Sequence, residues 1–278
     1  MSGNITFVGG GNMAMSLIGG LVENNYPSKQ ICVCEPDDDK RANLERTFGI
    51  RGTAENNEGV AKGDTVVLAE TPQIMEPVVT ALASAAQTHQ PLVVSIAAGI
   101  REPALAHWLG YDAAIVRTMP NTPSLLGLGA TALYANARVS DDQRAQADTI
   151  LRAARITLWV ENEDLIDAVT AVSGSGPAYF FYLMELMIEA GERLGLSEAS
   201  AKALTLQTAL GAARMALDSG EAPGTLRERV TSPGGTTERA LNIFREGGLG
   251  ELVDRALTGA RDRSEELGAA AAPAKKGN

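Results

Sequence analysis

The chain has 278 residues, which is more than one hydrophobic core usually serves, so its length predicts two domains. Hydrophobic residues make up 45% of the chain and aromatic residues only 4%, which is typical of a folded protein in which aliphatic side chains pack helices around a sheet. The formal net charge of −10 argues against a nucleic-acid or anionic-membrane surface, because such partners require a basic face.

Targeting segments and metal sites are not expected. No run approaches the roughly 20 apolar residues of a membrane-spanning helix, and residues 1–10 lack the basic start of a signal peptide, so we expect a cytoplasmic protein. Cys32 and Cys34 share one face of an expected strand, where they cannot bridge to each other, so we expect free thiols. His89 and His107 stand apart from any cysteine pair or acidic cluster, so no metal is expected.

Short apolar runs alternate with amphipathic stretches over the first 160 residues, which is the pattern of β-α-β units. The stretch 140–154 begins with a serine and two aspartates, which form a favourable helix N-cap and first turn. We therefore predict an α/β fold for residues 1–161, with a Rossmann-type, doubly wound and mostly parallel sheet. Strands are expected at residues 5–8, 31–34, 65–69, 92–96, 114–117, 130–134 and 157–160.

The pattern becomes helical after residue 161, so residues 162–268 are expected to form an all-helical domain. Its segment 179–184 is too apolar for a small bundle on its own, so we expect a partner subunit to cover part of it; packing on the N-terminal domain is the alternative. Residues 269–278 lack periodicity and predict a disordered tail. Helices are expected at residues 165–172, 178–194, 198–218, 224–230, 237–246 and 249–267.

A glycine-rich turn follows the first expected strand, where residues 9–14 fit the pattern G-x-G-x-x-A and lead into a helix. Gly9 would permit a tight turn, Gly11 would let the backbone approach a pyrophosphate, and Ala14 would allow close packing of helix on strand. The helix N-terminus would then receive the negative charge of a dinucleotide. The alternative is a glycine turn that binds no ligand.

An acidic residue, Glu35, directly follows the second expected strand. A carboxylate at this place can accept hydrogen bonds from the ribose hydroxyls of NAD and would repel the 2′-phosphate of NADP, so it favours NADH. The alternative is that the acidic residues 37–39 only cap the following helix, which leaves Lys40 and Arg41 free to reach a phosphate.

Four further segments, together with the glycine turn, resemble the pyrroline-5-carboxylate reductase family in order and spacing. The resemblance runs through all of the chain except the tail. The segments are residues 94–99 (Val-Ser-Ile-Ala-Ala-Gly), 117–123 (Arg-Thr-Met-Pro-Asn-Thr-Pro), 172–179 (Val-Ser-Gly-Ser-Gly-Pro-Ala-Tyr) and 232–237 (Ser-Pro-Gly-Gly-Thr-Thr).

The resemblance implies an enzyme that reduces the cyclic imine 1-pyrroline-5-carboxylate to L-proline with NADPH or NADH, in the last step of proline biosynthesis. It also implies that the helical domain is a dimerisation domain, that dimers can assemble into rings, and that the substrate lies near the dimer interface. Gly234, Gly235, Thr236 and Thr237 would bind the substrate. The cofactor would be lined by Val8, Gly9, Gly10, Gly11, Asn12, Met13, Glu35, Asn56, Ala69, Glu70, Thr71, Pro72, Ile96, Ala97 and Ala98.

The chemistry of the loop before the helix at 237–246 agrees with this implication. A Pro-Gly-Gly-Thr-Thr turn presents unpaired N–H groups at a helix N-terminus, which suits the carboxylate of a small imino acid. A threonine hydroxyl is too weak an acid to protonate the imine nitrogen alone, so Thr237 is expected to orient the imine and relay a proton from water. The alternative is that Thr236 and Thr237 are only an N-cap pair.

Two other segments leave alternatives open. Residues 119–123 predict a loop that shapes the nicotinamide end of the cleft, or else a turn stiffened by prolines. The small residues of segment 173–177 predict close approach of substrate or a partner helix, or else a helix break before a proline at a helix start.

The sequence departs from the family at three places. Residues 69–72 read Ala-Glu-Thr-Pro where members often have Ala-Val-Lys-Pro, and Glu35 replaces a small polar residue. Both changes, including Thr71 in place of the lysine, favour NADH over NADPH. A histidine that many members carry before Pro223 is absent. The remaining alternatives are a related reductase of other cyclic imino acids, a nucleotide-sensing protein without catalysis, and a β-hydroxyacid dehydrogenase, for which Lys202 offers no suitable context.

Overall fold

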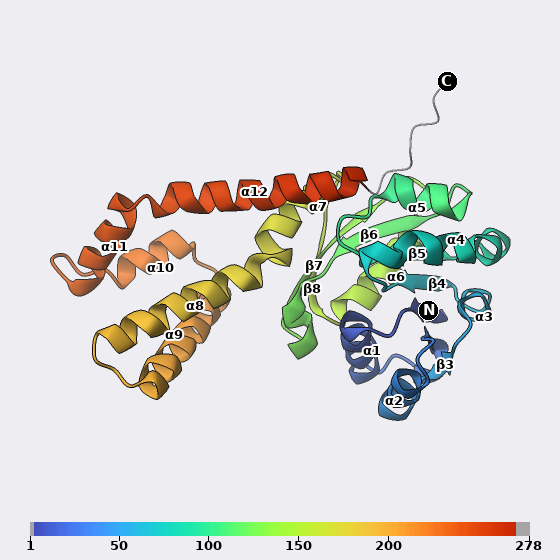
Figure 1. Cartoon of the computed structure of the whole chain (residues 1–278), viewed down its shortest axis with the longest axis horizontal. Helices are drawn as coiled ribbons and strands as arrows, with labels where there is room; N and C mark the ends of the chain where they lie inside the picture. The colour runs from blue at the N-terminus through green and yellow to red at the C-terminus, as the bar shows by residue number, and fades with distance from the viewer. Residues whose placement is uncertain (1–2, 271–278) are drawn as a thin grey trace, which may run out of the picture. The chain divides into compact units, whose positions relative to one another are not determined.

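A computed structural model of the chain describes residues 3–270 (Figure 1). The described residues divide into two compact units, one made of residues 3–175 and 259–270 and the other of Gly176–Thr258. The expected domain ranges, 1–161 and 162–268, differ from these units and stay a prediction. No helix within residues 3–270 is long and apolar enough to cross a membrane.

The first unit contains one eight-stranded sheet, whose strands lie in the order β3-β2-β1-β4-β5-β6-β7-β8. All neighbouring strands are parallel except β6 and β7, which confirms the mostly parallel sheet expected from the sequence. The strands are β1 (Ile5–Val8), β2 (Ile31–Cys34), β3 (Arg51–Thr53), β4 (Thr65–Leu68), β5 (Leu92–Ser95), β6 (Ile115–Met119), β7 (Gly129–Ala135) and β8 (Arg155–Trp159).

Helices cover both faces of this sheet, because successive strand residues point to opposite sides and both sides are apolar. One core gathers Phe7 of β1 with residues of α1 (Asn12–Glu23), α2 (Asp38–Phe48) and α6 (Asp141–Arg152). The other gathers Val8 with residues of α3 (Asn56–Val60), α4 (Pro72–His89) and α5 (Glu102–Leu109). Two 3-10 turns, η1 (Ser28–Gln30) and η2 (Thr122–Leu126), complete the connections.

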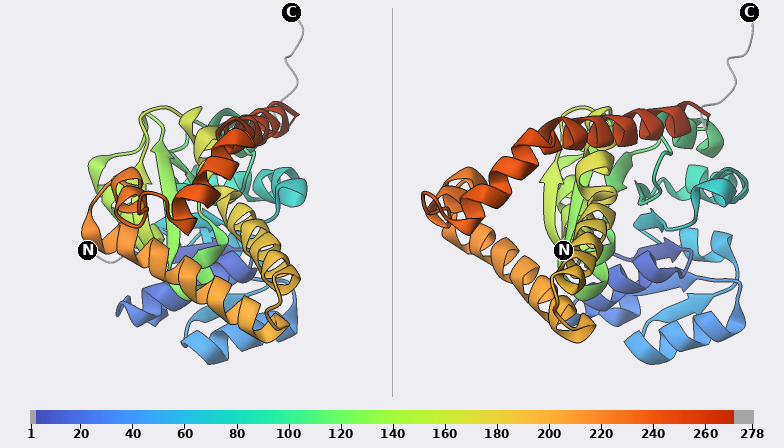
Figure 2. Two further views of the ribbon diagram at one scale, coloured as in Figure 1. Left: turned by 90° about the vertical axis from the view of Figure 1, so that its left-hand side faces the viewer. Right: turned by 60° about the vertical axis from the view of Figure 1, so that its left-hand side comes forward.

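The helices after the sheet begin with α7 (Leu165–Val169), which continues as a π-helical turn, η3 (Thr170–Gly174). In the second unit α8 and α9 pack against each other and lie side by side in both views of Figure 2. The later helices are α8 (Gly176–Arg193), α9 (Glu198–Ser219), α10 (Pro223–Arg229), α11 (Thr236–Glu246) and α12 (Leu249–Ala270).

Helix α12 is shared between the two units, because its residues up to Thr258 belong to the second and the rest to the first. The expected disordered tail at 269–278 is therefore wrong at residues 269 and 270, which continue α12. Both residues are alanines, which have the highest helix propensity, and they extend a helix that has already formed over the preceding residues. The remainder of that expectation, residues 271–278, lies outside the described part of the chain.

A buried ionic cluster attaches the end of α12 to the sheet unit. Asp167 is fully buried on α7, and its Oδ1 accepts a hydrogen bond of 2.6 Å from the hydroxyl of Ser264 on α12. Its Oδ2 lies 2.6 Å from a guanidinium nitrogen of Arg101. The equally buried Arg117 of β6 lies 3.7 Å from Asp167 Oδ1 and 3.2 Å from Glu163 Oε1. Both charges of the buried pair thus have partners of opposite sign.

The cysteines lie in a strand, as the sequence predicted. Cys32 and Cys34 are free and buried in β2. His89 and His107 occupy the last turns of α4 and α5. Strand β3 was not expected: its three residues are half-buried at the edge of the sheet and carry no apolar alternation.

Candidate functional site

The chain order reverses at β1, which has β2 on one side and β4 on the other. Ligands of open parallel sheets bind at such a reversal, beyond the carboxyl ends of the strands. The N–H of Ala69, just after β4, donates to the carbonyl of Val8 at 2.8 Å, and the N–H of Gly9 donates to the carbonyl of Cys34 at 2.9 Å. The structure thus brings the loops after β1, β2 and β4 together at one edge.

The turn after β1 has the backbone that a dinucleotide requires. Gly9 has a φ of +97°, which favours glycine, and a Cβ there would lie 2.9 Å from the carbonyl oxygen of Ala69. Gly11 is the exposed N-cap of α1, and no atom lies within 4 Å of the position its Cβ would take. No side chain caps this helix, so its first N–H groups are available to a phosphate. These residues fit a pyrophosphate group.

Glu35 stands beside this turn. Its side chain is buried at 8% exposure, and its two carboxylate oxygens accept from the N–H of Gly10 at 3.2 Å and of Asp37 at 3.1 Å. Asp37 caps α2 by accepting from the N–H of Lys40 at 3.0 Å, so the capping alternative is right for Asp37, although it does not account for Glu35. Arg41 is not free, because it donates to the Glu35 carbonyl at 2.8 Å and pairs with Asp38.

The other expected cofactor residues reach the same edge of the sheet. Thr71 is the N-cap of α4 and Pro72 is its first residue. The N–H of Ile96, just after β5, donates to the carbonyl of Leu68 at 3.2 Å; Ala97 is buried and Ala98 exposed. Asn56 begins α3, and its carbonyl lies 4.0 Å from the sulfur of Cys34 at the end of β2. Their role as cofactor contacts stays a prediction.

Glu70 places a second carboxylate at the glycine turn. A Cβ on Gly9 would lie 3.0 Å from Glu70 Oε1. Partial burial raises the pKa of the Glu70 carboxyl, and the charge of Glu35 raises it further, while Lys40 lowers it. The Glu70 carboxylate is therefore less readily ionised than an exposed one.

Two of the motif segments contact each other, which sequence reasoning missed. The side-chain amide of Asn121 donates to the hydroxyl of Ser173 at 3.1 Å, while its oxygen accepts from the N–H of Ala130 at 2.9 Å. A Cβ on Gly174 would lie 2.3 Å from the methyl carbon of Met119. The lack of a side chain at Gly174 therefore permits a close approach within this chain. The one sequence signal for this contact is the amide side chain of Asn121 inside a proline-rich turn, because asparagine in turns commonly forms hydrogen bonds.

The loop 232–237 belongs to the second unit and carries the expected substrate residues. Gly234 has a φ of +71°, and its N–H donates to Glu238 Oε2 at 2.8 Å. The N–H of Gly235 donates to the carbonyl of Ser232 at 3.0 Å. Two of the N–H groups expected to meet an anion are thus already engaged, because the turn closes on itself.

The threonines that follow remain suited to an anion. Gly235 is the N-cap of α11, so Thr236 and Thr237 are the first two helical residues, and the alternative that they form an N-cap pair is wrong. The N–H groups of a helix's first turn have no acceptor within the helix. Thr236 and Thr237 therefore offer two adjacent N–H donors and a half-buried hydroxyl, that of Thr237.

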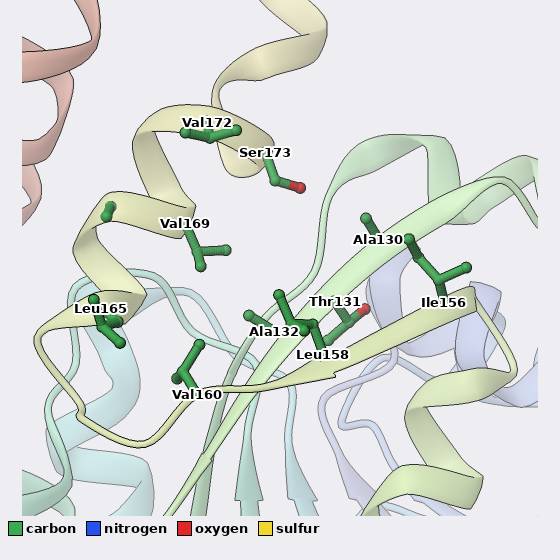
Figure 3. A pocket seen from close by; sticks show the side chains of 11 residues that line it. Ala130, Thr131, Ala132, Ile156, Leu158, Val160, Leu165, Val169, Val172 and Ser173 are labelled. Atoms are coloured by element: carbon green, nitrogen blue, oxygen red, sulfur yellow. The ribbon is translucent and has the colours of Figure 1, made fainter. Parts of the chain in front are cut away.

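An apolar hollow of about 350 Å³ lies on the first unit, between the outer strands β7 and β8 and the helical segment of α7 and η3 (Figure 3). Ile156 and Leu158 project from β8 with more than half of their side-chain surface exposed, and Val172 does so from η3. The hollow's other lining residues are Ala130, Thr131, Ala132, Val160, Leu165, Ala168, Val169 and Ser173.

Comparison with known proteins assigns the family. The pyrroline-5-carboxylate reductase of Pseudomonas aeruginosa is 54% identical over 263 residues, which cover 95% of this chain and 96% of that protein. The chain belongs to the pyrroline-5-carboxylate reductase family. The reductase of Vibrio alginolyticus is 42% identical over 95% of this chain. Members of this family are NAD(P)H-dependent oxidoreductases, as the sequence predicted.

Solved structures of pyrroline-5-carboxylate reductases share the fold. The enzyme from Coxiella burnetii has a TM-score of 0.92 and 45% identity, and the alignment covers 96% of this chain and 99% of that one. A Plasmodium falciparum pyrroline carboxylate reductase with NADP bound has a TM-score of 0.83 and 27% identity, covering 95% of this chain and 98% of that one. The fold class expected from the sequence is confirmed.

Two family descriptions match separate parts of this reductase-family chain. Residues 4–99 match "NADP oxidoreductase coenzyme F420-dependent" and residues 163–267 match "Pyrroline-5-carboxylate reductase dimerisation". The dimerisation region includes α7 and η3, which form one wall of the apolar hollow. It also includes α8, which carries Phe180 and Phe181, each 64% exposed. The helical part of the chain is therefore a dimerisation region.

Proposed function

We propose that this protein reduces 1-pyrroline-5-carboxylate to L-proline with NAD(P)H, in the last step of proline biosynthesis. The observation that carries the proposal is the 54% identity to a pyrroline-5-carboxylate reductase over nearly the full length of both chains. The open glycine turn at the reversal of the sheet supports it, because a hydride-transferring enzyme must hold a dinucleotide.

The sheet unit supplies the proposed cofactor contacts. When bound, the dinucleotide provides the hydride for the imine carbon. The glycine turn and the free N–H groups of α1 hold the pyrophosphate, Glu35 and Asn56 contact the ribose, and the loops after β4 and β5 line the remainder. These roles rest on Val8, Gly9, Gly10, Gly11, Asn12, Met13, Glu35, Asn56, Ala69, Glu70, Thr71, Pro72, Ile96, Ala97 and Ala98.

The loop before α11 is the proposed substrate receptor. Gly234 and Gly235 shape the turn, and the N–H groups of Thr236 and Thr237 hold the substrate carboxylate. The hydroxyl of Thr237 orients the imine nitrogen and passes it a proton from water, which makes the imine carbon electrophilic. Thr237 is thus the proposed catalytic residue.

Replacing Thr237 tests this role. We expect Thr237→Ala to lower kcat/KM for the imine by about a hundredfold, because the protonated imine loses its hydroxyl contact. Thr237→Ser should recover most of the activity, since it restores the hydroxyl. Steady-state kinetics over a range of imine concentrations measures both. Unchanged efficiency in Thr237→Ala would remove this hydroxyl from the mechanism.

The proposed reaction is tested by following oxidation of NADH and NADPH with the five-membered imine and its six-membered homologue offered separately. Fast turnover of 1-pyrroline-5-carboxylate alone supports the proposal. Faster turnover of the six-membered imine would instead identify a related cyclic imino-acid reductase. Tight dinucleotide binding without turnover of either imine would contradict an enzymatic function and favour nucleotide sensing.

We also propose that the small-molecule substrate is bound in a homodimer, formed through the helical region, and that dimers assemble further into a ring. The exposed apolar side chains of α8 support a dimer, because a second copy would remove them from water. The molar mass from light scattering tests the dimer and the ring separately. A cytoplasmic location is proposed as well, supported by the free thiols of Cys32 and Cys34, and cell fractionation tests it.

A further inference from the structure

We infer that three side chains at the edge of β2 and β4 select NADH over NADPH: the carboxylates of Glu35 and Glu70, and Arg41, whose guanidinium is already engaged. The inference rests on the proposed function, because it concerns the cofactor of that reaction. NADPH differs from NADH only by a phosphate on the adenosine ribose, so selection requires either repulsion of that phosphate or the lack of a cation to receive it.

Glu35 provides the first carboxylate. Its oxygens accept hydrogen bonds from two backbone N–H groups, at Gly10 and Asp37, which hold the group in place beside the glycine turn. A Cβ added to Gly10 would lie 3.0 Å from Glu35 Oε2. A fixed carboxylate here can accept from a ribose hydroxyl but repels a phosphate on the same sugar.

Glu70 provides the second carboxylate. It follows β4, which pairs with β1 on the side away from β2. It lies against Gly9 as Glu35 lies against Gly10, so the two groups flank one turn. Burial raises the pKa of the Glu70 carboxyl, and the nearby charge of Glu35 raises it further. A phosphate that enters between them meets two like charges in a partly buried place, where repulsion is stronger than in water.

Arg41 is the residue that could offset this repulsion, because arginine is the usual partner of a 2′-phosphate. Its Nη1 donates to the carbonyl oxygen of Glu35 at 2.8 Å, and its Nη2 pairs with the carboxylate of Asp38. The side chain also packs against β3, since a Cβ on Gly52 would lie 2.7 Å from Arg41 Cγ. Both terminal nitrogens and the stem are therefore engaged.

The surrounding charge has the same sign. The edge carries five carboxylates, those of residues 35, 37, 38, 39 and 70, against two cations, Lys40 and Arg41. Lys40 is exposed, and its charge acts on Glu70 against that of Glu35. It is the one cation of this edge whose amine has no partner in the described residues, and it cannot balance the local negative potential.

The first experiment is calorimetric titration of the full-length protein with NAD⁺ and NADP⁺, and with the fragments 5′-AMP and 2′,5′-ADP, which carry no nicotinamide. We expect NAD⁺ and 5′-AMP to bind about tenfold tighter than their phosphorylated counterparts. Equal or tighter binding of NADP⁺ would overturn the inference. Reduction of the imine by NADPH would leave the proposed function intact in that case, so the two failures are distinguishable.

Variants separate the contributions. Glu35→Gln and Glu70→Gln should each raise the affinity for 2′,5′-ADP relative to 5′-AMP by about five- to tenfold, since each removes one like charge. Asp38→Ala should raise it further than Asp39→Ala, because both remove one exposed charge but only the first releases Arg41. Equal effects of the two aspartate variants, or no effect of both glutamate variants, would contradict the assignment.

Discussion

The two units of the chain differ in where their apolar side chains lie. Among the described residues, every buried hydrophobic residue but one belongs to the sheet unit, and the exception is Ala201 on α9. The helical unit, Gly176–Thr258, instead exposes large side chains along whole helices. On α8 they include Phe180, Phe181, Tyr182, Leu183, Leu186 and Met187, each more than 40% exposed.

This difference teaches that compactness and an apolar core are separate properties. The sheet unit contains two hydrophobic cores of its own, which is the property that allows a domain to fold independently. The helical unit carries enough apolar residues for a core but does not surround them within one chain. Burial of apolar surface is the main stabilising contribution, so the proposed homodimer predicts that the helical unit depends on a second copy for its stability.

The largest effect is expected from a charge placed on α8. Phe181→Arg should give a monomer and lower imine reduction by about a hundredfold or more, because an unpaired charge in an apolar interface costs several kcal/mol. Dinucleotide binding to the sheet unit should persist. Light scattering and calorimetry measure the two outcomes, with Thr80→Arg at an exposed position of α4 in the sheet unit as the control. A stable dimer of Phe181→Arg would show that α8 is not the interface.

The next largest effect concerns the attachment of α12 to the sheet unit. Asp167→Ala should lower the free energy of unfolding by about 3–5 kcal/mol, because it leaves Arg117 buried and poorly paired. Ser264→Ala removes one hydrogen bond to the same carboxylate and should cost only about 1 kcal/mol. Urea unfolding of both variants gives the values. If they cost the same, the charge of Asp167 contributes nothing beyond its bond to Ser264.

A matched pair of leucines compares the two units directly. Leu17→Ala in α1, where the side chain is fully buried, should lower the free energy of unfolding by about 2–5 kcal/mol at any protein concentration. Leu183→Ala in α8, where it is 49% exposed, should instead weaken the dimer and act more strongly in dilute protein. Thermal unfolding at two concentrations measures this. The comparison fails if Leu183→Ala shows no dependence on concentration.

The smallest effects come from two N-cap serines. Ser140 caps α6 in the sheet unit by accepting from the N–H of Gln143 at 3.3 Å, and Ser197 caps α9 in the helical unit by accepting from the N–H of Ser200 at 3.2 Å. Either serine changed to alanine should cost about 1 kcal/mol. Only the loss at Ser197 should depend on protein concentration, and an equal dependence for both would argue that the units unfold together.

The sheet unit could be predicted closely from its sequence because its strands are short, apolar and separated by clear helical patterns. Strands β1 and β2 have the expected bounds, Ile5–Val8 and Ile31–Cys34. Strand β3 could not be predicted, because an edge strand of three half-buried residues needs neither apolar alternation nor length. The end of α12 was also missed, since its attachment depends on a contact between residues far apart in the chain.

The candidate site was predictable only where local backbone demands particular residues. Gly9 could be predicted from its turn, because its φ of +97° favours glycine. Gly11 has an ordinary φ of −70° and open space around it, so its motif position reflects the approach of a ligand and not the local backbone. The engagement of Arg41 and the bridge from Asn121 to Ser173 required the folded structure, because side-chain partners are chosen by packing. The free N–H groups before α11 were overestimated, since a turn's internal hydrogen bonds are not visible in its composition.

The shared helix α12 has a consequence for the order of events during synthesis. Asp167 and Ser264, which meet in the buried cluster, are 97 residues apart in the chain. At synthesis rates of roughly 5–20 residues per second, Asp167 is made about 5–20 s before Ser264. The ionic cluster of the nascent sheet unit therefore lacks Ser264 until every residue of the helical unit has been translated. The part of the protein that begins to fold first is completed last.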